Sequence, residues 1–349
     1  MSVQFIGTTF AQNSQWHVDE KTLIDSIIAQ INKHYSQSKS LLVNTTWFGP
    51  QFDNGEYQKF LALTNNEKFD KLFLLAAVDP VFLNADQIQS VFKQSGATEL
   101  FLCGHFDSKY QFNFHTLVLP KYFHSYSDSD LKMTSPDYVY VCYNRKPRPH
   151  RIDLVQALVN NNLKQFGIIS LGKNNSTYSN TNQEDLYFLL DEDPEDFAKE
   201  GNWNLPMNFG IPHDIHSLGK MDIWKRHFVN IVSETEFWPW DNLFVSEKTW
   251  KPILGLRPFL VNGQTQVYSW LGNHGFKTFE HYWPVSVANL PEYEVHQSIV
   301  NVITYLSKLS KRELGDMYND MLPDLLYNRE RFFEFAKEQQ YKVNHLFHQ

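Results

Sequence analysis

The fold is decided by residues 228–279, FVNIVSETEFWPWDNLFVSEKTWKPILGLRPFLVNGQTQVYSWLGNHGFKTF. An apolar run over 228–232 predicts a buried strand, and the polar group SEKT at 246–249 predicts the start of a helix. A second apolar run over 258–261 predicts another strand, and 267–271 predict a second helix. The order strand, helix, strand, helix is typical of a parallel sheet in an α/β protein.

Polar residues follow the first of these strands and begin the helix after it. In open parallel sheets, ligands bind beyond the carboxyl ends of the strands, where Glu234 and Glu236 are expected. A helix N-terminus that carries Lys248 suits a phosphate, and Glu247 can accept two hydrogen bonds from a vicinal diol such as a ribose. A nucleotide would use both. Alternatively, Ser246 is an ordinary N-cap followed by Glu in the first turn, which stabilises a helix without any ligand.

A basic loop precedes a second predicted helix. The β-type run 138–143 is followed by NRKPRPHR over 144–151 and then by apolar residues spaced three or four apart. Pro149 suits the first helical turn. Four basic residues therefore gather at a helix start, where they favour a diphosphate or form a solvated turn: Arg145, Lys146, Arg148 and Arg151.

The first part of the chain predicts a separate α/β domain. Apolar runs at 40–44, 71–77 and 99–103 alternate with helical patterns. If the strand ends face a cleft, the candidates for binding an acceptor are Trp47, Asp79, His105 and Asp107.

The string SEKTxKPI at 246–253, with Gly255, Pro258-Phe259 and GFKTF at 275–279, resembles the donor-site region of glycosyltransferases with the GT-B fold. It is most similar to the fucosyltransferase-like and exostosin-like groups and to glycosyltransferase-like proteins common in bacteriophage genomes. The basic pattern at 144–151 also resembles the phage group. The resemblance covers residues 138–279 and implies two Rossmann-like domains facing a cleft, with a helical C-terminal tail.

This resemblance implies a domain layout and site roles. The expected parts are an acceptor domain over 1–135, a nucleotide-sugar domain over 136–290 and a helical tail over 291–349 that packs across both. Glu247 would hold the ribose and Lys248 the phosphates. The full expected donor-binding set is Arg145, Arg148, Arg151, Glu234, Glu236, Ser246, Glu247 and Lys248.

The expected activity is transfer of a sugar from a nucleotide sugar to an acceptor hydroxyl. An inverting enzyme would need a general base, for which Asp79, His105 and Asp107 are the candidates, and a retaining enzyme would not. No cofactor or metal is expected, because enzymes of this fold offset the charge of the leaving diphosphate with basic residues and helix dipoles. The spacing of His213 and His216 could serve a metal, but neither HExxH nor a cysteine set accompanies it.

The acceptor is expected to be a saccharide or a hydroxymethylated base in phage DNA. A net charge of −8 favours the saccharide, because phosphate contacts need Lys and Arg. The alternative from another class is a non-catalytic nucleotide- or carbohydrate-binding protein. A glycoside hydrolase is disfavoured, because Glu234 and Glu236 lie two apart on a strand end and point the same way.

The cysteines indicate the compartment. Cys103 and Cys142 lie in apolar runs and read as buried thiols, which indicates the cytoplasm. Neither a signal peptide nor an apolar run long enough to span a membrane is recognised.

In the tail, Ser310 to Glu313 forms a capping-box pattern, and Pro323 is expected to separate two helices.

Overall fold

The computed structural model describes residues 3–8, 15–46, 48–52, 55–78, 83–144, 148–171, 218, 221–237 and 243–348. The contacts divide the chain into two compact units. The first unit comprises Met1–Val118, Trp240–Phe244 and Ala336–Gln349, and the second comprises Leu119–Pro239 and Val245–Phe335. Each unit is built around its own parallel sheet, so the predicted α/β class with two parallel sheets is confirmed.

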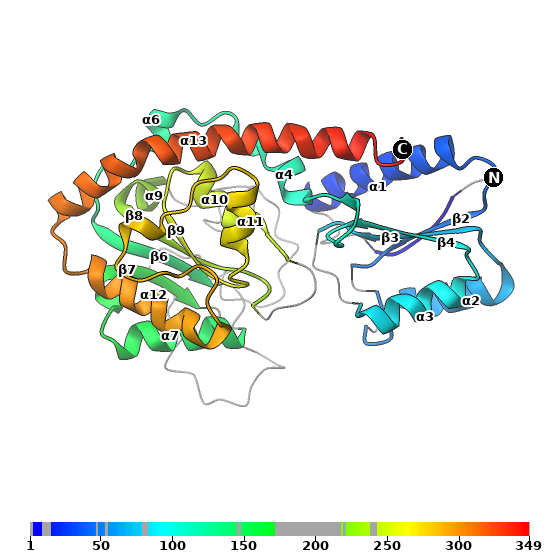
Figure 1. Cartoon of the computed structure of the whole chain (residues 1–349), viewed down its shortest axis with the longest axis horizontal. Coiled ribbons are helices and arrows are strands. Elements are labelled where there is room, and N and C mark those ends of the chain that lie inside the picture. Colours follow the sequence, from blue (N-terminus) through cyan, green and yellow to red (C-terminus); the bar gives the residue numbers. More distant parts are fainter. Residues whose placement is uncertain are drawn as a thin grey trace. The chain divides into compact units, whose positions relative to one another are not determined.

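The first unit contains a parallel sheet in the order β1-β2-β3-β4-β5. The apolar runs in the sequence give its central strands, and β2 and β3 are buried at every position. Figure 1 shows α1 on one face of this sheet and α2 and α3 on the other. The elements are β1 Gln4–Ile6, α1 Gln15–His34, β2 Ser40–Asn44, α2 Glu56–Asn66, β3 Lys71–Ala76, α3 Ala85–Ser95, β4 Glu99–Gly104, β5 Tyr110–Gln111 and α4 Phe114–Val118.

Strand register sorts the side chains of this sheet onto two faces. Phe73 and Phe101 are paired across β3 and β4, and their rings stack with centroids 4.4 Å apart. Tyr35, which follows α1, and Phe347 from the C-terminal end pack against both rings. The alternate residues of the strand, such as Leu74, point to the other face of the sheet and pack with α2 and α3. The alternation follows from the two-residue period of a strand.

The second unit contains a parallel sheet in the order β7-β6-β8-β9. Its strands are β6 Tyr138–Asn144, β7 Gly167–Leu171, β8 His227–Ser233 and β9 Phe259–Asn262. The strands predicted at 138–143, 228–232 and 258–261 are confirmed by β6, β8 and β9. From β6 the chain returns on one side as β7, and from β8 it returns on the other side as β9. The gap between β6 and β8 is therefore a topological switch point, the usual ligand position in such sheets.

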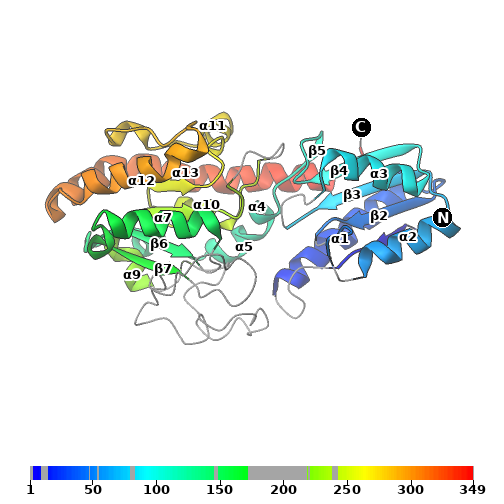
Figure 2. The same cartoon turned by 90° about the horizontal axis from the view of Figure 1, so that it is seen from below.

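Helices cover both faces of the second sheet. Figure 1 shows α7 and α12 on one face and α10 on the other, and Figure 2 gives the perpendicular view. Trp250 of α10 is fully buried against Trp270, Phe276 and Phe332. The helices are α5 Pro120–Phe123, α6 Asp128–Leu131, α7 Pro149–Asn160, η1 Lys164–Phe166, α9 Met221–Arg226, α10 Glu247–Leu254, α11 Val267–Asn273, η4 Glu280–Tyr282, α12 Glu292–Leu306 and α13 Lys311–Asn344.

The last helix differs from the prediction. Pro323 lies inside α13, which runs unbroken from Lys311 to Asn344, so the expected separation into two helices is wrong. Proline removes one intrahelical hydrogen bond, but buried side chains on both sides of it, such as Met321 and Leu325, keep the helix packed. The capping box at its start is confirmed. Ser310 N donates to Glu313 Oε2 at 2.7 Å, and Glu313 N donates to Ser310 Oγ at 3.2 Å.

In the part of the chain that the structure describes, none of the helices combines the length and the apolar character that crossing a bilayer requires.

Candidate functional site

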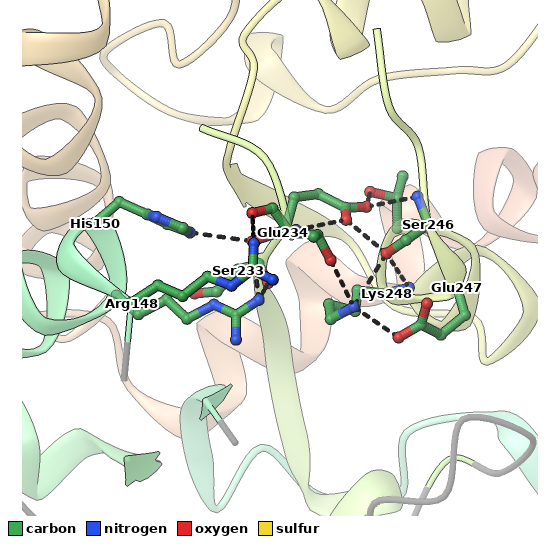
Figure 3. Close-up of polar contacts among 10 residues, drawn as sticks. Arg148, His150, Ser233, Glu234, Ser246, Glu247 and Lys248 are labelled. Atoms are coloured by element: carbon green, nitrogen blue, oxygen red, sulfur yellow. Dashed lines mark hydrogen bonds and ion pairs between the residues drawn. The ribbon is translucent and has the colours of Figure 1, made fainter. Parts of the chain in front are cut away.

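Two helix starts meet at the switch point of the second sheet. Helix α7 follows the carboxyl end of β6, and α10 follows the carboxyl end of the neighbouring strand β8. The residue that joins them is Glu234, directly after β8, which Figure 3 shows between the side chains of the two helix starts. The predicted site residues of this unit that the structure describes are therefore gathered in one place.

The carboxylate of Glu234 is enclosed by donors. The residue is 1% exposed. Its Oε1 accepts from Ser246 N at 3.1 Å and Thr249 Oγ1 at 2.7 Å, and its Oε2 accepts from Ser246 Oγ at 2.5 Å and Thr235 N at 3.2 Å. Four donors meet the acceptor capacity of a carboxylate. The sugar contact predicted for Glu234 stays a prediction, but these bonds already engage both of its oxygens.

The backbone carbonyl of Glu234 is bound to the first turn of α7. His150 Nε2 and Arg151 Nη2 each lie 3.0 Å from this oxygen, and Arg151 also donates to Ser233 O at 3.2 Å. Burial and the neighbouring Arg151 lower the pKa of His150 from 6.5 to about 3. The imidazole is thus neutral near pH 7, and its Nε2 is the proton donor in this bond. Burial also lowers the pKa of Arg151 to about 10, which leaves the guanidinium charged.

At the start of α10, Lys248 and Glu247 form an ion pair. Lys248 Nζ lies 2.7 Å from Glu247 Oε1, 3.3 Å from Ser246 Oγ and 3.4 Å from Thr235 Oγ1. The Glu247 side chain is 9% exposed, and that of Lys248 is 32% exposed. Ser246 is the N-cap and accepts a hydrogen bond from Lys248 N at 3.3 Å. The predicted N-cap is confirmed, and the ammonium beside it remains accessible.

Arg148 occupies the corresponding place at the start of α7. It is the N-cap residue, makes no side-chain cap, and is followed by Pro149, which suits the first turn. Its guanidinium donates to Thr235 O and lies 3.6 Å from Glu236 Oε1. The predicted partners Arg145 and Lys146 lie outside the described residues. Among those described, each of the three cations Arg148, Arg151 and Lys248 has a neighbouring carboxylate in Glu236, Glu234 or Glu247.

Several residues of the site were missed by sequence reasoning. Asn262 ends β9, is fully buried, and donates to His150 O at 3.2 Å and Ser233 Oγ at 3.3 Å. Its Oδ1 lies 3.0 Å from His296 Nε2 of α12. Because Asn262 closes a strand at the same sheet edge as Glu234, its position after an apolar run was a signal that could have found it. Thr249 belongs to the quoted SEKT string, but only the fold shows that it binds Glu234.

In the first unit, His105 follows β4 and is enclosed by aromatic rings. It is 4% exposed, with ring centroids of His115 and Phe244 at 6.1 and 4.9 Å. Burial, with a smaller effect of His115, lowers the pKa of His105 from 6.5 to about 3. Asp107 lies on the surface, and Trp47 and Asp79 lie outside the described residues. The general-base role of these residues stays a prediction. His105 could act as a base only if the enclosing rings of His115 and Phe244 moved aside.

The buried His105 predicts an acid-sensitive stability. Its pKa is lower in the folded protein, so the unfolded chain binds the proton first, and stability is lost as pH falls from about 6.5 to about 3. At pH 5 the loss from this residue should be about 2 kcal/mol. Urea unfolding at pH 7.5 and pH 5 would measure it, with His105→Gln losing less than the natural protein by that amount. An equal loss in both proteins would contradict the assignment.

Metal ligation finds no candidate in the described ranges. Nowhere in them do three or more His, Cys, Asp or Glu side chains gather in a way that could hold a metal ion. His213 and His216, whose spacing drew attention, lie outside these ranges.

Comparison with protein-family models, with curated proteins and with solved structures finds no match to this chain.

Proposed function

We propose that the protein is a nucleotide-sugar-dependent glycosyltransferase of the GT-B type, with its donor site at the switch point of the second sheet. One observation carries the proposal. Two helix starts, one with Arg148 and Arg151 and the other with Lys248 and Glu247, meet at the carboxyl ends of adjacent parallel strands. Helix starts with basic side chains suit a diphosphate, and a carboxylate beside them suits a ribose diol.

The proposed chemistry puts a definite demand on these residues. As the bond from the sugar to the diphosphate breaks, negative charge grows on the leaving oxygen. Lys248 Nζ is part-exposed, held within 3.4 Å of Thr235 Oγ1, and thus prearranged to stabilise that charge. Arg148 is the second such cation. Both would exchange their present carboxylate partner for phosphate oxygens when the donor binds.

The proposed acceptor is a hydroxyl of a glycan or of a hydroxymethylated base in phage DNA. A cytoplasmic location forms part of the proposal and is supported by two buried free thiols, Cys103 and Cys142.

A transfer assay tests this function. The protein is incubated with each common nucleotide sugar, alone and with oligosaccharide or hydroxymethylated duplex DNA, and the released nucleoside diphosphate is measured. We expect release from one donor class, increased by one acceptor class. For a DNA acceptor, binding of the duplex should weaken steeply with salt. Release that no acceptor increases, from any donor, would contradict transferase activity.

The burial of His105 favours a second candidate function, a nucleotide- or carbohydrate-binding protein that performs no transfer. Of the predicted bases that the structure describes, His105 is enclosed and Asp107 lies on the surface. Tight nucleotide binding without hydrolysis or transfer across the same panel would identify this alternative.

A further inference from the structure

We propose that Glu234 is a positioning residue, which sets the starts of α7 and α10 in register for one shared ligand. The inference rests on the proposed nucleotide site and assigns Glu234 a role different from sugar contact. Its carboxylate holds the first turn of α10 through Ser246 and Thr249. Its carbonyl oxygen holds the first turn of α7 through His150 and Arg151. A single residue thus fixes both helix starts.

Burial and saturation distinguish this role from direct binding. The side chain is 1% exposed, and each oxygen already accepts two hydrogen bonds. A ligand hydroxyl would have to displace one of these donors. The same bonds orient Ser246 Oγ, which lies 3.3 Å from Lys248 Nζ, so the carboxylate reaches the ligand-facing ammonium through one intermediate.

Gly263 provides the space that Glu234 needs. A Cβ at this glycine would lie 2.8 Å from Glu234 Cβ, closer than real side chains approach, and 3.3 Å from its Cγ. The turn after β9 therefore fits against Glu234, and alanine at 263 would push the carboxylate from its place. This substitution tests position without changing charge.

Substitutions of the two neighbouring carboxylates, Glu234 and Glu236, should have different effects on the affinity for anions. Glu234→Gln and Glu236→Gln each remove one negative charge near the proposed phosphates, which by itself strengthens anion binding. Glutamine at 234 also turns an NH2 group toward the backbone N–H of either Ser246 or Thr235, whichever way the amide is turned. An N–H cannot accept a hydrogen bond, so the helix starts shift. We expect affinity for pyrophosphate and nucleoside diphosphates to fall at least about tenfold in Glu234→Gln. In Glu236→Gln, which removes the carboxylate 3.6 Å from the Arg148 guanidinium, affinity should stay equal or rise.

The experiment is calorimetric titration of the folded proteins at low temperature with pyrophosphate and with uridine, guanosine, adenosine, cytidine and thymidine diphosphates. Gly263→Ala should weaken binding severalfold. The matched control Gly272→Ala, where a Cβ meets nothing within 4 Å, should not. If Glu234→Gln fails to fold, Thr249→Val, which removes one donor to the carboxylate, takes its place and should also weaken binding.

The outcomes separate this inference from the proposed function. If Glu234→Gln binds these probes as the natural protein does, or changes affinity in the same direction and by the same factor as Glu236→Gln, the positioning role is overturned. If the folded natural protein binds none of the probes, the proposed function is overturned first, and the inference falls with it.

Discussion

Replacing Arg257 with methionine should lower the free energy of unfolding of the second unit by about 3–5 kcal/mol, because it removes the donor of a fully buried hydrogen-bond group. The residue is 0% exposed, and its guanidinium donates to Leu131 O at 2.9 Å, Leu256 O at 2.7 Å and twice to Trp224 O. Burial lowers its pKa to about 10, so the group stays charged near pH 7. Methionine fills similar space but removes all of these bonds, so that Leu256 O keeps only its bond from Tyr318 Oη at 3.2 Å.

Arg226→Met is the matched control in the same unit. Its guanidinium pairs with Asp137 at 2.6 Å and Asp222 at 3.1 Å, but its side chain is 37% exposed. Solvent screens exposed ion pairs, so they contribute little to stability and this variant should unfold close to the natural protein. Urea unfolding followed by tryptophan fluorescence compares them. Equal small losses in both variants would show that the Arg257 bonds do not hold the unit together.

Replacing Lys248 or Glu247 with alanine should weaken nucleoside diphosphate binding while leaving the fold intact. Hydrogen bonds to charged groups contribute about 1.5–3 kcal/mol, so the loss of Lys248 should reduce affinity roughly tenfold to a hundredfold. Glu247→Ala should act mainly on ligands that carry a ribose, and much less on pyrophosphate, because a carboxylate binds the diol and not the phosphates. Competition titrations with pyrophosphate and the nucleoside diphosphate that binds best measure both effects.

Lys251→Ala provides the control for charge, because Lys251 lies one turn further along the same helix. This change removes the same charge away from the helix start and should alter affinity less than about threefold. Equal affinity in Lys248→Ala, Glu247→Ala and the natural protein would show that the start of α10 does not bind the nucleotide.

Local sequence patterns predicted the strands and the helix start that surround the site, because a strand end or a helix start is marked by residue types within a few positions. The apolar runs gave β6, β8 and β9, and the SEKT string gave the N-cap Ser246 of α10. Parallel strand order then follows from general rules for α/β folds. These patterns were sufficient to predict that Arg148, Arg151 and Lys248 lie at one edge of the sheet.

Partnerships across the sheet were not predictable in this way. Glu234 was expected to face a ligand, yet its carboxylate binds Ser246 and Thr249, twelve and fifteen residues further along. Such pairing depends on how deeply each side chain is buried in the folded unit, which cannot be predicted from the neighbouring residues in the sequence. His105 illustrates the same limit, because its strand-end position indicated access while Phe244, far along the chain, covers it. Pro323 was misread because packing outweighed its local preference.

The most direct test of the central claim is calorimetric titration of the natural protein with the five common nucleoside diphosphates. The account predicts that at least one binds with one-to-one stoichiometry and a clear preference for its base, and that the bound nucleotide raises the unfolding temperature with its concentration. Heat and thermal shifts indistinguishable from buffer for all five, in protein shown to be folded, would contradict a nucleotide site at the starts of α7 and α10.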